Sequence, residues 1–264
     1  MTDPSPFEPL GLSPHAQETP PEGTPPPAPP PEREPFWGYS DLALFIGLLA
    51  ASLLVSMLFG AALRMVHWLT NAPGAETVVL ESLMYVLAFS GLGVYFEIQY
   101  GRPFWSSLGW KPFSMPVALI VLYGVLTAVG VAVLGAVIRT PTSNNRVTEM
   151  LQDPRSIALI AVFGVTLGPL AEELGFRGFL QPLLVRGLGP VPGVIAAAIP
   201  FGMLHFWEYG NSWRHALLIS LAGFLFGWVR YRTGSTRASA LMHASYNAFE
   251  FFAYFAQPKG APHT

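Results

Sequence analysis

The stretch LALFIGLLAASLLVSMLFGAAL, residues 42–63, decides the fold class because it contains no charged side chain. A transmembrane α-helix needs about 20 consecutive apolar residues to cross the hydrocarbon core of a bilayer. The composition of the whole chain agrees, since 52% of its 264 residues are hydrophobic and 11% are charged, against about 25% charged in an average soluble domain. The sequence therefore predicts an integral membrane protein.

Other apolar stretches predict further membrane spans. Residues 77–96, interrupted by Glu81, and the uncharged residues 112–138 are both long enough to cross a bilayer. A polar loop follows at residues 139–155. Four more spans are expected to begin near Ile157, Val191, His215 and Ala238. We therefore predict an all-α fold, a polytopic transmembrane helical bundle of about seven spans, with an eighth or re-entrant segment as the alternative.

The N-terminus differs from the rest of the chain in composition. Residues 1–35 contain 13 of the 26 prolines, mixed with Glu, Thr and Ser. Such a segment cannot bury enough apolar surface to offset the loss of chain entropy on folding. We therefore expect a disordered, proline-rich tail at residues 1–37, which serves as a spacer or, alternatively, binds a proline-recognition module.

Bulk charge and cysteine content exclude several classes of function. The 14 basic and 16 acidic residues give a net charge of -2, so no basic excess predicts binding to nucleic acid. The chain has no cysteine, which excludes disulfides, thiolate metal sites and a cysteine nucleophile. Any catalysis must therefore use other side chains.

Ionisable residues interrupt the apolar runs of the second half. Near the middle of a membrane each costs about 2.5–3.5 kcal/mol on insertion scales, so such residues mark candidate functional sites. Glu173 and Arg177 have the i, i+4 spacing at which a carboxylate and a guanidinium meet on a helix. We predict that these two side chains pair and that Glu172, about 100° away around the helix, faces a cavity. The alternative is that both glutamates are solvated at the end of the fourth span.

Two histidines also lie in or beside apolar runs. Phe201 precedes His205 by one helical turn, and Pro200 is expected to loosen the helix there. His243 and Asn247 have i, i+4 spacing, which places an imidazole and a carboxamide on one helix face. Considered separately, each of these groups could also be a hydrogen-bonded structural residue.

Together, these residues reproduce the motifs of a known family. The sequence EELGFRG at residues 172–178 resembles the EExxFRG motif of the CPBP family, which comprises CAAX prenyl proteases and bacteriocin-processing enzymes and is also called the Abi family. Phe201 with His205 resembles its FxxxH motif, and His243 with Asn247 resembles its HxxxN motif. All three motifs occur in order, each on its own predicted span.

The resemblance implies an intramembrane endopeptidase of the glutamate/histidine kind. The site residues that it implies are the catalytic Glu172, Glu173, His205, His243 and Asn247 and the supporting Arg177 and Phe201. By this resemblance, Glu172 and His205 activate a water that attacks a peptide carbonyl. His243 and Asn247 complete the site, in which they can donate hydrogen bonds to the oxyanion.

The composition and the resemblance divide the chain into four parts. These are a disordered proline-rich tail at residues 1–37, N-terminal transmembrane helices at 38–154, a CPBP/Abi-like catalytic membrane core at 155–256 and a short tail at 257–264. The resemblance covers about residues 155–255. The first half therefore matches the family only as a generic set of helices.

The sequence leaves the participation of a metal open. The family is often described as metalloproteases, and Glu172, His205 and His243 would form a two-histidine, one-carboxylate set that holds zinc with a water in the open position. However, the chain has no HExxH pair, and Asn247 is a poor zinc ligand. A zinc mechanism and a metal-free mechanism are therefore kept as equal alternatives.

The resemblance also implies the partners. One partner is the lipid bilayer of a prokaryotic plasma membrane, with an organelle membrane as the alternative. The other is a peptide or protein substrate, either a lipidated CAAX-type peptide or another membrane-associated peptide, although no residue pattern specifies a prenyl pocket. Two other functions are considered. A non-catalytic membrane adaptor would keep the site for binding. A proton-coupled transporter would use Glu172, His205, His243 and Glu250 as a relay, but the two halves of the sequence show no internal repeat.

Overall fold

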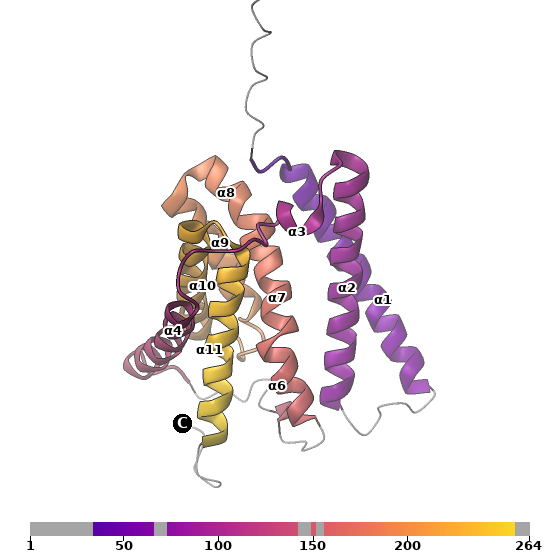
Figure 1. The fold of residues 1–264 in the computed structure, drawn as a ribbon. Coiled ribbons are helices and arrows are strands. Elements are labelled where there is room, and N and C mark those ends of the chain that lie inside the picture. The colour runs from indigo at the N-terminus through magenta and orange to yellow at the C-terminus, as the bar shows by residue number, and fades with distance from the viewer. Residues whose placement is uncertain (1–33, 66–72, 142–148, 152–155, 257–264) are drawn as a thin grey trace, which may run out of the picture. The chain divides into compact units, whose positions relative to one another are not determined.

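The computed structural model describes residues 34–65, 73–141, 149–151 and 156–256 (Figure 1). The predicted N-terminal tail up to residue 33 and the predicted short tail at residues 257–264 lie outside the described residues. All regular elements of the described residues are helices, with no strand among them. This confirms the all-α fold class.

The helices of the first half are α1 (Tyr39–Met65), α2 (Pro73–Tyr100), α3 (Phe104–Ser107) and α4 (Val117–Val137). The first two form an antiparallel pair (Figure 1). At one end of this pair, Arg64 of α1 donates to Glu76 of α2 (2.7 Å). At the other end, the buried Asp41 accepts hydrogen bonds from the hydroxyls of Tyr95 (2.5 Å) and Tyr100 (2.8 Å). Polar contacts therefore fix both ends of the pair.

The helices of the second half are α6 (Ile157–Val165), α7 (Leu167–Glu173), η1 (Leu174–Leu180), α8 (Gln181–Leu188), α9 (Pro190–Leu204), α10 (Trp213–Thr233) and α11 (Thr236–Ala256). The elements from α6 to α8 follow one another along one long helical run, in which η1 is a π-helix. α9 packs against α8 and α10, and α11 packs against α4, α7 and α10. The predicted catalytic core is therefore a cluster of packed helices.

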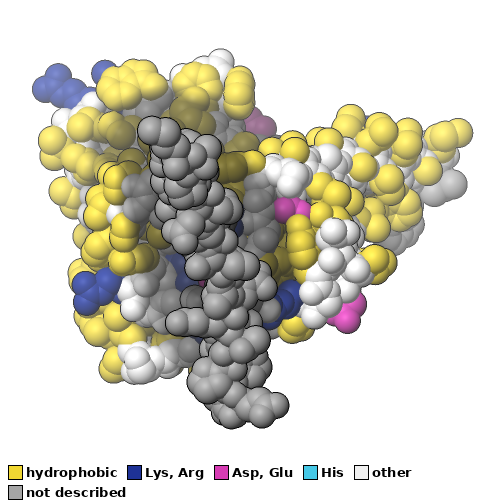
Figure 2. Space-filling model, turned by 90° about the horizontal axis from the view of Figure 1, so that it is seen from above, with side chains coloured by type: hydrophobic (Ala, Val, Ile, Leu, Met, Phe, Trp, Pro, Cys, Tyr) yellow, Lys and Arg dark blue, Asp and Glu magenta, His cyan; other side chains and the backbone are white. Residues whose placement is uncertain are grey.

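In the part of the chain that the structure describes, four helices are long and apolar enough to cross a membrane: Tyr39–Met65, Gly74–Tyr100, Val117–Val137 and Ile157–Leu188. α9 is apolar but shorter. The outer surface is hydrophobic as well, since side chains such as Ile46, Leu54 and Leu58 of α1 are exposed, and hydrophobic side chains dominate the face seen in Figure 2. These features confirm a helical membrane bundle, and the count of seven spans stays a prediction.

The fourth span does not end at the two glutamates. Helical structure continues from Glu173 through η1 to Leu188, because Leu174 and Phe179 continue the buried apolar face. Gly178 permits this continuation past a neighbouring chain segment, since a Cβ atom there would lie 2.9 Å from the carbonyl oxygen of Leu108. The alternative in which both glutamates are solvated at a helix end is therefore wrong.

Residues 34–37, which the sequence assigns to the tail, are packed against the bundle. Trp37 is buried, and its Nε1 donates to the carbonyl oxygen of Phe179 (3.1 Å). The rings of Trp37 and Phe179 are stacked with their centroids 5.4 Å apart. The neighbouring Phe36 ring packs edge-on against Phe96, with 5.1 Å between the centroids. The packed region therefore begins before residue 38.

Candidate active site

A buried ion pair lies at the centre of the second half. The carboxylate of Glu173 and the guanidinium of Arg177 are 0% and 1% exposed, and Oε1 and Nη1 are 2.9 Å apart. This is the pair that the i, i+4 spacing predicts. Arg177 also donates from Nη2 to the carbonyl oxygen of Gly223 on α10 (2.9 Å), and its Cζ lies 4.1 Å from the centroid of the Phe201 ring on α9. Arg177 therefore joins η1 to two neighbouring helices.

His243 on α11 bridges the two glutamates of α7. Its Nδ1 lies 3.1 Å from Oε1 of Glu173, and its Nε2 lies 3.9 Å from Oε2 of Glu172. An ionised carboxylate can only accept a hydrogen bond, so Nδ1 carries the hydrogen and Nε2 faces Glu172. The ring is stacked on Phe226 of α10 with centroids 4.6 Å apart. These contacts fix both the position and the orientation of the imidazole.

The two adjacent glutamates differ in exposure. The side chain of Glu172 is 27% exposed, whereas that of Glu173 is fully buried. Arg177, Glu173, His243 and Glu172 thus form a row that is buried at the arginine and open at Glu172. Of the two carboxylates, Glu172 is the one that a water molecule or a substrate can reach.

The Phe201 ring brings the three motifs together. It lies 5.2 Å from Phe176, 5.3 Å from His205 and 5.8 Å from His243, measured between ring centroids. His205, half-buried at the C-terminal end of α9, lies with its Nδ1 3.0 Å from the carbonyl oxygen of Phe201. A carbonyl oxygen can only accept, so Nδ1 carries the hydrogen and Nε2 is left as the basic nitrogen.

Asn247, one turn after His243, contacts a different partner. Its Nδ2 donates to the carbonyl oxygen of Gly164 (2.7 Å), just before α6 ends at Val165. The helical run is irregular there: Thr166 has φ -122° and ψ -84°, and Pro169 has no N–H to donate. Asn247 therefore binds α11 to this irregular turn, while His243 on the same helix binds the carboxylates.

The predicted zinc ligands do not form a metal site. Among the residues that the structure describes, which include Glu172, His205 and His243, no three His, Asp or Glu side chains lie close enough together to hold a metal ion. His243 directs both ring nitrogens at carboxylates, and the Phe201 ring contacts both histidines. The side chains present therefore do not fit a two-histidine, one-carboxylate zinc centre.

Two residues of the site were missed in the sequence. Phe226 holds the His243 ring by stacking, and Gly223 admits Arg177 and Phe201, since a Cβ atom at residue 223 would lie 2.7 Å from the Phe201 ring and 3.0 Å from Nη2 of Arg177. The four-residue spacing of Gly223 and Gly227 in the sequence is typical of close helix packing. This spacing was the signal that could have identified Gly223. A single phenylalanine among many in an apolar helix gives no such signal.

Comparison with known proteins identifies the region that contains these residues. Residues 154–249 match the family model described as type II CAAX prenyl endopeptidase Rce1-like. No curated protein and no solved structure matches the chain. The matched segment contains all three motifs, and a protease of this family acts on a peptide or protein substrate in a lipid environment. Residues 154–249 of this integral membrane protein are therefore similar to the Rce1-like type II CAAX prenyl endopeptidases.

Proposed function

We propose that this protein is an intramembrane endopeptidase in which Glu172 is the general base that activates a water to hydrolyse a peptide bond near the membrane surface. The observation that supports it best is the row from Arg177 through Glu173 and His243 to Glu172. In this row the buried members hold one another in place, and the exposed member is free to act on water.

The hydrolytic step is balanced without any other reactant. Glu172 takes one proton from the water as the water oxygen attacks the peptide carbonyl carbon, and a tetrahedral intermediate forms. Glu172 then gives this proton to the leaving nitrogen as the C–N bond breaks, which yields a carboxylic acid and an amine. The acid passes its remaining proton to the amine, so the final products are a carboxylate and an ammonium ion. His205, whose Nε2 is left as an acceptor by the contact between Nδ1 and Phe201, assists Glu172 in orienting the water.

His243 and Asn247 are proposed to stabilise the oxyanion of the intermediate. When His243 is protonated, it donates from Nδ1 to Glu173 and presents Nε2–H on the side of Glu172. Asn247 uses one amide hydrogen on Gly164 and keeps the other for a ligand. A single oxyanion donor typically contributes about 2.7–4 kcal/mol to catalysis.

We propose a CAAX-type peptide as the substrate class, with a lipid attached near the scissile bond, and the prokaryotic plasma membrane as the location. The support for this substrate class is the family match over residues 154–249. Another membrane-associated peptide is the alternative. We also propose residues 38–154, 155–256 and 257–264 as functional parts of the chain, with catalysis in the second; residues 34–37 pack with the bundle and not with the tail to which the sequence assigned them.

The test is cleavage of lipidated and unlipidated CAAX-type peptides and of a pooled set of membrane-protein tail peptides by purified protein in detergent. Wild type is compared with Glu172→Ala and His205→Ala, with Glu97→Ala as a control at an exposed glutamate of α2. We expect cleavage by wild type and the control and none by the two site variants, with and without a chelator. Loss of cleavage on chelation would contradict the metal-free mechanism, and a wild type that cuts no peptide would favour the adaptor.

A further inference from the structure

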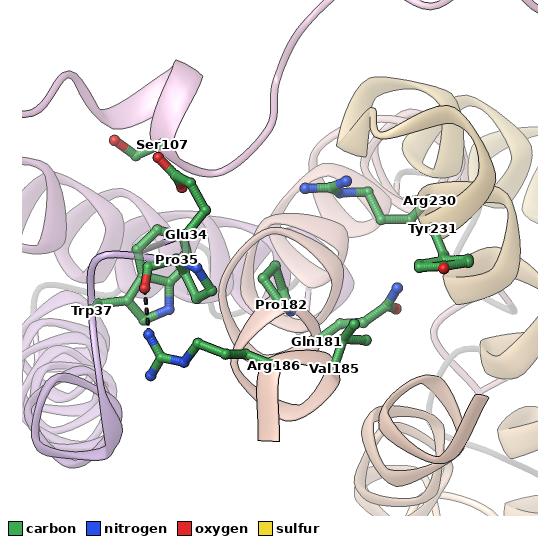
Figure 3. Close-up of a pocket in the computed structure, with 10 residues that line it drawn as sticks. All are labelled: Glu34, Pro35, Trp37, Ser107, Gln181, Pro182, Val185, Arg186, Arg230 and Tyr231. Atoms are coloured by element: carbon green, nitrogen blue, oxygen red, sulfur yellow. Dashed lines mark hydrogen bonds between the residues drawn. The ribbon is translucent and has the colours of Figure 1, made fainter. Parts of the chain in front are cut away.

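A second site is suggested by a cavity of about 310 Å³ that none of the proposed catalytic residues line. It lies between residues 34–37, α3, α8 and α10 (Figure 3). Arg186 of α8 and Arg230 of α10 contribute one guanidinium each. Among the described lining residues Glu34 is the one carboxylate, so the lining has a net positive charge.

Arg230 is held in an orientation that leaves its terminal nitrogens for a ligand. Its Nε donates to Oγ1 of Thr236 (2.9 Å), and that hydroxyl donates to the carbonyl oxygen of Leu108 (2.5 Å). Gly109 leaves room for the guanidinium, because a Cβ atom there would lie 2.3 Å from Nη2 of Arg230. Among the described residues no hydrogen-bond partner is found for Nη1 or Nη2, whose fork geometry suits phosphate and carboxylate oxygens.

Arg186 is also anchored at the cavity wall. Its Nη1 donates to the carbonyl oxygen of Pro35, as Figure 3 shows, while the rest of the side chain stays exposed. The buried Gln181 forms part of the lining and donates from Nε2 to the carbonyl oxygen of Gly227 (2.9 Å). Pro182 and Val185 provide apolar wall beside these polar groups. The cavity therefore combines two cations with an apolar surface.

The cavity lies at the basic end of the bundle. The described basic residues at this end are Arg102, Lys111, Arg186, Arg230, Arg232 and Arg237, and they outnumber the described acidic residues Glu34, Asp41 and Glu97. Ser235 Oγ donates to the carbonyl oxygen of Lys111 (2.5 Å), which ties the turn between α10 and α11 to the segment after α3. The Trp105 and Trp110 rings, 5.7 Å apart, lie in the same region, and Figure 2 shows Lys and Arg side chains on this face. Basic residues and tryptophans are both typical of the depth of lipid headgroups.

We propose that this cavity binds the phosphate of an anionic phospholipid headgroup, with Arg230 pairing with its oxygens and Arg186, on the opposite side of α8, adding positive charge at the rim (Figure 3). Basic pockets between membrane helices are suited to anionic headgroups. Pro182 and Val185 supply the surface against which the glycerol and the first methylenes pack. This lipid site is separate from the row that ends at Glu172 and does not depend on proteolytic activity.

The experiment is a binding titration of the purified full-length protein in detergent, followed by native mass spectrometry. The probes are phosphatidylglycerol, phosphatidylcholine with the same acyl chains, and inorganic phosphate. We expect phosphatidylglycerol to bind at least about tenfold more tightly than phosphatidylcholine. Arg230→Gln should weaken phosphatidylglycerol binding about tenfold, as expected for loss of a charge-assisted hydrogen bond. Arg186→Gln should weaken it about threefold, because it removes positive charge from the rim without removing a direct contact.

The matched control is Arg232→Gln, an exposed arginine at the same end that does not line the cavity. It should change the affinity less than about twofold if binding is local. Equal weakening by Arg232→Gln, or equal binding of both lipids, would overturn the site. Competition by millimolar inorganic phosphate would show that the ligand is free phosphate and would overturn the lipid assignment. Arg186 is exposed, so its variant keeps the test valid if Arg230→Gln does not fold.

Discussion

At the scale of single residues, Glu172 and Glu173 are adjacent and chemically identical but differ in burial. The pairing of Glu173 with Arg177 could be predicted from the sequence, because both residues lie on one helix and their spacing fixes the geometry. The contact of His243 with Glu173 could not, because it joins residues 70 positions apart and depends on how α11 packs against α7. Sequence spacing thus predicts contacts within a helix far better than contacts between helices.

The buried pair should matter for stability far more than an exposed one. Glu173→Gln removes one partner and leaves the buried Arg177 uncompensated, which is expected to lower the free energy of unfolding by about 3–5 kcal/mol. Glu76→Gln breaks the pair with Arg64, whose side chain is 63% exposed, and should cost less than about 1 kcal/mol. Thermal unfolding of both variants in detergent measures the difference. Equal melting temperatures would contradict the importance assigned to burial.

The stacking of Phe226 on His243 should contribute to turnover. Phe226→Leu keeps the residue apolar but removes the ring that lies 4.6 Å from the imidazole. Aromatic pairs contribute about 0.5–1.5 kcal/mol, so kcat should fall by up to about tenfold while the protein stays folded. Phe252→Leu, at a phenylalanine that is 69% exposed, is the matched control. An unchanged kcat in Phe226→Leu would show that the stacking does not position His243.

At the scale of elements, hydropathy predicts where helices lie but not how they continue or bend. The apolar runs at residues 42–63, 77–96 and 112–138 each correspond to one helix. The alternative that placed both glutamates at a solvated end of the fourth span was wrong, because the helix continues to Leu188. In the structure the π-helical turn carries the chain past the glutamates, and such turns occur often at functional sites.

The contact between α9 and α10 should be sensitive to a single methyl group. A Cβ atom at Gly202 would lie 2.1 Å from Oγ of Ser220 and 2.3 Å from the carbonyl oxygen of Ala216. Gly202→Ala should therefore push the helices apart, destabilise the protein by about 1–3 kcal/mol and displace Phe201 and His205. Unfolding and peptide cleavage measure the two effects.

Gly130 provides the control for this substitution, because a Cβ atom there meets nothing within 4 Å. Gly130→Ala should leave cleavage unchanged and, as a helix-interior glycine replaced by alanine, stabilise the protein by about 0.5–1 kcal/mol. If Gly202→Ala behaved like Gly130→Ala, the close approach of α9 and α10 would not be needed for the site.

At the scale of the whole molecule, Trp37 is one of the contacts that tie the first half of the chain to the catalytic half, beside the packing of α4 against α10 and α11. Composition predicted the membrane bundle correctly, since lipid-facing helices need apolar side chains. It also placed residues 34–37 in the tail, because the high proline content next to them outweighed the signal of Phe36 and Trp37. The aromatic packing of these residues against Phe96 and Phe179 was therefore not foreseen.

Removal of the Trp37 side chain should loosen this connection. Trp37→Ala deletes a buried ring and its hydrogen bond to Phe179, so we expect a loss of about 3–5 kcal/mol in the free energy of unfolding. Tyr39→Ala, at a tyrosine that is 59% exposed, should have little effect. Thermal unfolding in detergent compares the two. Similar melting temperatures for both variants would contradict the assignment of Trp37 to the core.

The most direct test of the account is the cleavage rate of Glu172→Gln, measured on the best peptide substrate in parallel with its melting temperature. The substitution keeps the shape of the side chain and removes its ability to take a proton. If Glu172 is the general base, the variant should melt like wild type and cleave about 10²–10⁴-fold more slowly, the usual contribution of general acid–base catalysis. A folded Glu172→Gln variant that cleaves at the wild-type rate would contradict this assignment.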